Sequence, residues 1–236
     1  MVHLSVNINK IATIRNARGG NTPNVVGAAI KCQCYGADGI TVHPREDQRH
    51  ITDQDVYDIK DEITTEYNIE GYPSKRFINM ILNIKPDQVT LVPDTVEVIT
   101  SNSGWDTIKH TSFLKEIVSE FQSNKIRTSI FVNPDVKMIQ AVEKTGTDRI
   151  ELYTGSYASD FSKNKEKAIR PYVISAEVAK EMNIGINAGH DLNLDNLEFF
   201  CKNIKFLNEV SIGHALISDS LYFGLENTIQ MYKRLI

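Results

Sequence analysis

Imidazole and carboxyl side chains occur where short apolar runs of the sequence end. His43, His190 and His214 each follow such a run, and Glu70 and Glu151 end or interrupt two others. Histidine changes its protonation state near neutral pH, and a partly buried glutamate can have its pKa raised toward the same range. Together the five residues could transfer several protons in one reaction. A single histidine of this kind is more often a hydrogen-bonded packing residue, so the prediction requires that all five meet.

The same segments carry groups suited to bind phosphate. Arg18, Arg45 and Arg49 follow the first two apolar runs, and a guanidinium group can bind two phosphate oxygens at once. Backbone amides at Gly213-His214, before the last helical pattern, offer a second anion site. Two anion sites predict phosphorylated small-molecule substrates. Each arginine taken alone also fits a solvated surface charge.

A repeating pattern of strands and helices must position these residues. Short apolar runs predict eight strands, at 4–8, 39–43, 67–70, 88–92, 127–132, 149–153, 184–188 and 209–213. Helical periodicity predicts helices at 53–64, 74–83, 111–123, 135–145, 163–182, 193–202 and 218–235, with a polar loop from Gly155. Without a linker or a shift in composition, this pattern predicts one α/β domain over 1–236, a (β/α)8 TIM barrel with room for extra helices. Such barrels carry their chemistry at the carboxyl ends of the strands.

Composition excludes several classes of protein. The net charge of −4 would repel nucleic acid, and no run of about 18 apolar residues suggests a membrane span. The three cysteines are too few and odd in number for a disulfide framework, which favours the cytoplasm. The histidines and glutamates could in principle bind a metal ion. Basic residues crowd the same loops, so we expect no metal.

Four segments are long or distinctive enough to compare with known families. They are VNINKIATIRNARG (6–19), DGITVHPREDQRHI (38–51), NAGH (187–190) and IGHA (212–215). They resemble the pyridoxine 5'-phosphate synthase (PdxJ) family, and the similarity runs from the first strand to the last helix. The resemblance implies a (β/α)8 barrel and a ring-closing transferase of vitamin B6 (pyridoxine) biosynthesis that uses no metal and no organic cofactor. The implied reaction condenses 3-amino-2-oxopropyl phosphate with 1-deoxy-D-xylulose 5-phosphate to give pyridoxine 5'-phosphate, phosphate and water.

The resemblance also implies roles for individual positions. His43 and Glu70 match proton acceptors, His190 a proton donor and Glu151 a group that stabilises the transition state. Contacts to the aminoketone phosphate are matched by Asn7, Arg18, Asp191, Gly213 and His214. Contacts to the deoxyxylulose phosphate are matched by Asn9, Lys10, Arg45, His50 and Thr100.

This chain departs from the family pattern at three of these positions. Many members read Asn-Ile-Asp-His where this chain has Asn7-Ile8-Asn9-Lys10, and glycine is common where it has Asp191. Lysine adds positive charge beside a phosphorylated substrate, so we expect the same activity. The carboxylate of Asp191 should point away from the phosphate if its backbone amide binds there. Because family members assemble into rings of several barrels, we also expect a homo-oligomer, with an octamer among the candidate states.

Two other functions remain open on the residues alone. One is another phosphosugar-handling barrel, an aldolase or isomerase, in which Lys10 would form a Schiff base. The other is a non-catalytic binder of a phosphorylated metabolite, for which the two anion sites suffice and the glutamates have no task. Covalent trapping at Lys10 would favour the first, and binding without turnover the second.

Overall fold

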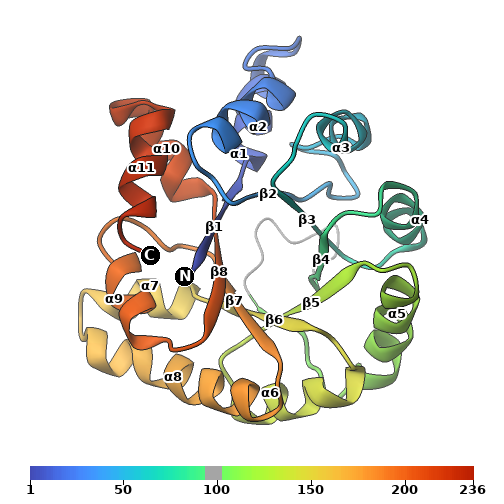
Figure 1. The fold of residues 1–236 in the computed structure, drawn as a ribbon, viewed down its shortest axis with the longest axis vertical. Coiled ribbons are helices and arrows are strands. Elements are labelled where there is room, and N and C mark those ends of the chain that lie inside the picture. The colour runs from blue at the N-terminus through green and yellow to red at the C-terminus, as the bar shows by residue number, and fades with distance from the viewer. Residues whose placement is uncertain (94–102) are drawn as a thin grey trace.

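The computed structural model describes residues 1–93 and 103–236. Within these ranges eight parallel strands close into a barrel in sequence order, with β8 paired to β1 (Figure 1). The strands are β1 (His3–Asn7), β2 (Gly39–Val42), β3 (Glu66–Gly71), β4 (Gln88–Leu91), β5 (Arg127–Val132), β6 (Arg149–Tyr153), β7 (Gly185–Gly189) and β8 (Leu207–Ile212). Each lies within two residues of its expected bounds. The predicted (β/α)8 TIM-barrel fold is therefore confirmed.

Helices surround the barrel on its outside (Figure 1). In the described part of the chain they are α1 (Asn9–Arg18), α2 (Val25–Cys34), α3 (Asp53–Lys60), α4 (Lys75–Ile84), α5 (Thr111–Ser123), α6 (Val136–Val142), the 3₁₀ turn η1 (Glu143–Thr145), α7 (Gly155–Phe161), α8 (Lys165–Glu181), α9 (Leu197–Asn203), α10 (His214–Phe223) and α11 (Leu225–Lys233). The single helix expected at 218–235 is two helices. Gly224 separates them because its φ of +77° lies in the left-handed region, which glycine adopts without strain.

The polar loop expected from Gly155 is wrong, because the segment folds as α7. Tyr157 anchors this short helix. Its ring is fully buried against those of Tyr172 and Phe200, and its hydroxyl donates to the backbone carbonyl of Asn196 at 2.7 Å. The helix has seven residues, and its two aromatic ones, Tyr157 and Phe161, are too few to give a clear periodic signal, so the sequence pattern did not reveal it.

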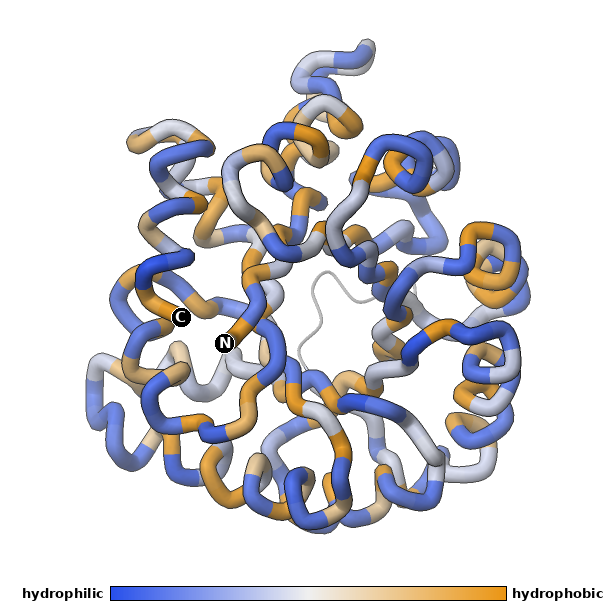
Figure 2. Tube along the Cα trace, in the orientation of Figure 1, coloured by the Kyte–Doolittle hydropathy of each residue, from blue (hydrophilic) through white to orange (hydrophobic). Residues whose placement is uncertain are grey.

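The hydrophobic core lies between the barrel and its helices. Alternate strand residues such as Leu4 and Val6 in β1, or Ile150 and Leu152 in β6, are fully buried and belong to the same apolar cluster as the inner faces of the helices. Figure 2 shows this alternation as changes of colour along the strands. Burying each such side chain contributes about 1.5–3 kcal/mol.

The interior of the barrel is polar. Side chains there bond across the barrel between strands that are not neighbours. Asn187 on β7 donates to Gln88 on β4 at 3.3 Å, and Arg149 on β6 pairs with Glu209 on β8 at 3.4 Å. Many barrels fill this space with branched apolar residues. Here the alternate strand positions bring polar groups together, and the last of them reach the carboxyl ends of the strands.

Candidate active site

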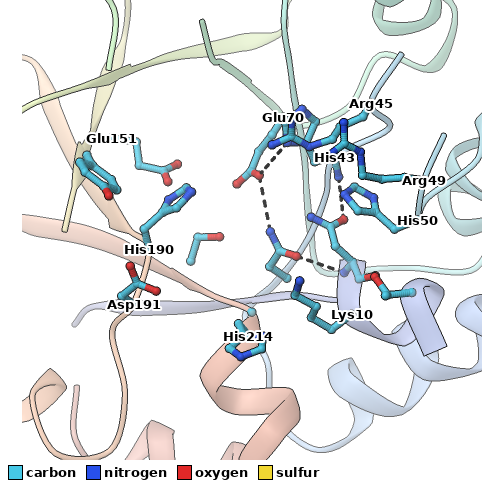
Figure 3. A pocket seen from close by; sticks show the side chains of 16 residues that line it. Lys10, His43, Arg45, Arg49, His50, Glu70, Glu151, His190, Asp191 and His214 are labelled. Atoms are coloured by element: carbon cyan, nitrogen blue, oxygen red, sulfur yellow. Dashed lines mark hydrogen bonds and ion pairs between the residues drawn. The ribbon is translucent and has the colours of Figure 1, made fainter. Parts of the chain in front are cut away.

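A cavity of about 500 Å³ lies at the carboxyl ends of the strands (Figure 3). Asn7 ends β1, His43 follows β2, Tyr153 ends β6 and Gly213 follows β8. The residues lining the cavity are Asn7, Asn9, Lys10, Thr13, His43, Arg45, Arg49, His50, Glu70, Glu151, Tyr153, His190, Asp191, Ser211, Gly213 and His214. Its volume is that of a typical small-molecule site.

Most of the residues expected at the site line this cavity; among the described residues one does not. Arg18 is the exposed last residue of α1 and lies outside the lining. Thr100 lies outside the described residues. Arg49, which the sequence indicated as a phosphate-binding candidate, is part of the lining.

Sequence reasoning missed Thr13, Tyr153 and Ser211. Tyr153 lies two residues after Glu151, and side chains two apart on a strand share a face. Ser211 has the same relation to Gly213, so strand periodicity could have found both. Thr13 lies in α1, a helix that was not expected, and helical spacing therefore could not be applied to it.

The carboxyl group of Glu70 lies beside the side chains of His43 and Asn7. Its Oε2 is 3.9 Å from Nδ1 of His43 and accepts a 3.5 Å hydrogen bond from Nδ2 of Asn7. Oδ1 of Asn9 accepts a hydrogen bond from the backbone N–H of His43 at 2.9 Å, and the backbone N–H of Asn9 donates to Oδ1 of Asn7 at 3.1 Å. The ends of β1, β2 and β3 are thus tied together, and an acid and an imidazole can reach the same small molecule.

His43 is a neutral imidazole in the folded protein. Burial, followed by the positive charge of Arg45, lowers its pKa well below the usual value, and His50, His190 and Arg49 add to the shift. A neutral imidazole keeps a lone pair at neutral pH. His43 can therefore accept a proton without first losing one.

Positive charge gathers on one side of the cavity. Arg45, Arg49 and Lys10 line it together with His50 (Figure 3). Burial, then Arg45, Lys10 and Arg49, lowers the pKa of His50 to about 4. Because Nδ1 of His50 accepts the backbone N–H of Ile51 at 2.9 Å, the neutral ring carries its proton on Nε2. Three cations and a neutral donor make this side suitable for an anion.

Glu151 lies deeper, on β6, and is 1% exposed. Burial, then the carboxyl groups of Glu70 and Glu209, raises its pKa well above the usual value. Its Oε2 has no hydrogen-bond partner among the described residues. A Cβ at Gly189 would lie 2.3 Å from its Oε1, so any larger residue there would displace the carboxyl group. The raised pKa favours the protonated acid, which could donate a hydrogen bond to a bound substrate.

His190 is placed by packing and by an unusual backbone. Its ring lies 5.0 Å from Phe131 and 5.5 Å from Tyr153, measured between centroids. Its φ is +81° and that of Asp191 is +58°, in the left-handed region that is unfavourable for residues other than glycine. The hydroxyl of Thr154 bonds to the carbonyl oxygens of Gly189, at 2.7 Å, and of His190. Strain maintained in this way is frequent at functional sites.

The N-terminus of α10 is a second place where an anion could bind. Gly213 caps this ten-residue helix without a side-chain hydrogen bond, and Gly213 and His214 both line the cavity. A Cβ at Gly213 would lie 3.1 Å from the Cβ of Asn7, so glycine keeps the backbone close to β1. Exposed backbone amides at a helix start attract anions. Within the described residues, no group of three or more His, Cys, Asp or Glu side chains is arranged to hold a metal ion.

Residues 4–236 match the family model described as pyridoxal phosphate biosynthesis protein PdxJ. The chain belongs to the PdxJ family. Pyridoxine 5'-phosphate synthase of Cytophaga hutchinsonii is 61% identical over 234 residues, which are 99% of this chain and 98% of that protein. The synthase of the same name from Christiangramia forsetii is 58% identical over 236 residues, 100% of each chain.

Solved structures with low sequence identity share the fold of this PdxJ-family chain. Tryptophan synthase from M. tuberculosis has a TM-score of 0.65 at 10% identity, covering 100% of this chain and 93% of that one. Phosphoribosylanthranilate isomerase from Thermotoga maritima has a TM-score of 0.60 at 14% identity, covering 100% and 98%. At such identities the likeness concerns the barrel alone.

Where this chain departs from the PdxJ pattern, the substituted residues are at the cavity. Lys10 lines it, and its charge contributes to the lowered pKa of His50. The side chain of Asn9 accepts a hydrogen bond from the backbone N–H of His43 and so joins α1 to the end of β2. Asp191 also lines the cavity, where its charge contributes to a raised pKa of Tyr153 that is due first to burial.

Proposed function

We propose that the protein is a pyridoxine 5'-phosphate synthase. It condenses 3-amino-2-oxopropyl phosphate with 1-deoxy-D-xylulose 5-phosphate and releases pyridoxine 5'-phosphate, phosphate and water. What supports this proposal beyond family membership is one observation. A single cavity holds an imidazole with a lowered pKa, a carboxyl group with a raised pKa and the carboxyl group of Glu70, between two places suited to bind phosphate.

In this proposal the acid–base groups divide the proton transfers. His43 and Glu70 accept protons, His190 donates one, and Glu151 stabilises charge that develops in the transition state. The raised pKa of Glu151 and the lowered pKa of His43 support the division, because they leave one group protonated and the other unprotonated at the same pH.

The two phosphates bind on different sides of the cavity. The aminoketone phosphate lies at the start of α10, with contacts proposed from Asn7, Arg18, Asp191, Gly213 and His214. The deoxyxylulose phosphate lies on the cationic side, with contacts proposed from Asn9, Lys10, Arg45, His50 and Thr100. Binding both substrates in register replaces an encounter of two molecules in solution by reaction within one complex.

An assay of product formation tests the proposal. The purified protein is given both substrates, and pyridoxine 5'-phosphate and inorganic phosphate are quantified by chromatography and colorimetry. Reactions that lack one substrate serve as controls. We expect both products in equal amounts only when both substrates are present. Folded protein that binds the substrates without forming product would be a binder and would refute the synthase.

We also propose that the protein acts in the cytoplasm as a homo-oligomer. No helix in the described ranges is long and apolar enough to cross a bilayer. Support for assembly comes from Leu221, Tyr222 and Phe223 at the end of α10, which are 72%, 84% and 48% exposed. Adjacent exposed apolar side chains often mark an interface between subunits. Light scattering after size-exclusion chromatography measures the assembly, and a mass of one chain would refute it.

A further inference from the structure

The segment after β2, residues 43–52, carries Arg45, Arg49 and His50 into the cavity, and we call it the 43–52 loop. We propose that Asn16 on α1 and Arg76 on α4 are positioning residues that fix this loop and so set the affinity for 1-deoxy-D-xylulose 5-phosphate. The proposal rests on the function proposed above. Neither residue lines the cavity, so each acts through the loop.

From the α1 side the contacts are to the backbone of the loop. Nδ2 of Asn16 donates to the carbonyl oxygens of Arg49, at 3.2 Å, and His50, at 2.8 Å. Nη2 of Arg15 donates to the same His50 carbonyl at 3.2 Å. One amide group therefore holds the two consecutive residues whose side chains bind the anion.

Arg15 is fixed by Asp55 in α3. Its guanidinium makes two hydrogen bonds to that carboxylate, and both side chains are 10% exposed. Oδ2 of Asp55 also accepts the backbone N–H and the hydroxyl of Thr52, each at 2.8 Å. The end of the loop and the start of α3 are thus joined to α1 by a buried ion pair.

From the α4 side the contacts reach the first half of the loop. Nη1 of Arg76 donates to the carbonyl of Pro44 at 3.4 Å and lies 3.4 Å from the carboxylate of Glu46. Arg76 also pairs with Asp53, and the hydroxyl of Ser74 bonds to Glu46. The loop is therefore held from both sides by its backbone and its outward-facing side chains, while Arg45, Arg49 and His50 face the cavity.

The same helix α1 carries Asn9, Lys10 and Thr13 on the cavity wall. Asn16 lies at its other end, so one rigid helix fixes the distance between Lys10 and the loop cations. A phosphate bound between them needs all donors at hydrogen-bond distance at once. A shift of the loop by an ångström would weaken binding without removing a charge.

The test compares Asn16→Ala and Arg76→Gln with wild type. Calorimetry gives the Kd of 1-deoxy-D-xylulose 5-phosphate, and steady-state kinetics give kcat and the KM of each substrate. Because Asn16 is exposed, its replacement should leave the melting temperature nearly unchanged. We expect Kd and KM for this substrate to rise about 5- to 10-fold in each variant, the effect of one or two hydrogen bonds. The KM of the aminoketone phosphate and kcat should stay within about twofold.

The matched control is Asn124→Ala. Its Nδ2 donates to the carbonyl of Glu120 at 2.9 Å at the end of α5, the same kind of contact away from the cavity. All constants of this control should equal those of wild type. Unchanged Kd and KM in both test variants would overturn the proposal, as would an equal loss in kcat. A wild type that binds the sugar phosphate but forms no product would refute the synthase, while weakened binding in the variants would still support the positioning role.

Discussion

His43 and Glu70 show how the surroundings of a residue decide its chemistry. Glu70 is bonded to Asn7, and His43 lies 3.9 Å away among cationic neighbours. An imidazole in solution is about half protonated near pH 6.5. Burial and positive charge keep His43 unprotonated, so it is ready to act as a base at neutral pH.

Removing either group should slow the reaction sharply. We expect His43→Ala and Glu70→Gln each to lower kcat by about 10²-fold, the usual contribution of a positioned acid or base. Steady-state kinetics measure the loss, and circular dichroism verifies that the variants are folded. Rates close to wild type would remove these residues from the proton-transfer scheme.

Glu151 makes the stability of the protein depend on pH. Its pKa is raised in the folded state, so the folded chain keeps a proton that the unfolded chain loses above about pH 4.3. The contribution of the protonated carboxyl is fully present below that pH and is lost as the pH rises through the folded-state pKa.

Glutamine at this position keeps the shape of the protonated acid and does not titrate. We therefore expect Glu151→Gln to become more stable relative to wild type between pH 5 and pH 8, by about 1.4 kcal/mol for each pH unit in that window that lies below the folded-state pKa of Glu151. Urea unfolding at both pH values gives the difference. A constant difference would mean that Glu151 is ionised in the folded state.

At the scale of elements, the end of β7 shows how a strand end positions a side chain of the cavity. The chain turns at His190 and Asp191 with positive φ, and Thr154 at the end of β6 bonds to the carbonyls on the turn. The carbonyl of Gly189 also accepts the backbone N–H of Thr154 at 2.9 Å. The bond to the His190 carbonyl therefore depends on the hydroxyl, whereas Gly189 has a second donor.

Valine at position 154 removes that hydroxyl with little change of shape. We expect Thr154→Val to lose about 1 kcal/mol of unfolding free energy and to lower kcat about 5- to 10-fold, because the backbone of His190 is less firmly held. The control is Thr228→Val, a buried threonine whose hydroxyl donates to the carbonyl of Gly224 at 2.9 Å. It should lose similar stability in urea and keep its kcat. An equal loss of kcat in both variants would contradict a local role.

At the scale of the whole molecule, the strands of the barrel turn apolar side chains toward the helices and polar side chains toward the barrel interior. Glu66, Arg127, Arg149 and Glu209 form a charged group near the start of the strands. Burial, then Glu66, raises the pKa of Glu209 well above the usual value. The pKa of Glu66 is shifted the other way. Burial raises it, but hydrogen bonds with Glu209 and Arg127 outweigh burial and lower it below the usual value. The opposite directions of the two pKa shifts favour a proton shared by the pair and held on Glu209.

This sharing predicts different effects of two substitutions at one position. Glu209→Gln should change the unfolding free energy by less than about 1 kcal/mol at pH 7, because glutamine replaces a neutral acid. Glu209→Ala should cost about 3 kcal/mol, because it removes the buried carboxyl group that Arg149 contacts at 3.4 Å and leaves a cavity in its place. Guanidinium unfolding of both variants checks this. Equal losses would mean that Glu209 is a carboxylate.

The fold and most of the lining could be predicted from the sequence for a physical reason. Apolar runs of four to six residues repeated eight times permit few other architectures, and a barrel places every strand end on one rim. His43, Glu70 and His190 therefore had to lie around one opening. Helices such as α7, which depend on one buried aromatic residue, carry no periodic signal and were missed.

The amino-acid sequence by itself determined which chemical groups meet, since strand order and alternation are local patterns. The tertiary structure alone decided the pKa values of these groups and which residues hold them in position. The pKa values of His43 and Glu151 depend on burial and on charges from distant strands, and Asn16 reaches His50 across 34 residues. Electrostatic and hydrogen-bond energies depend on distance in space, and only the closed barrel sets those distances.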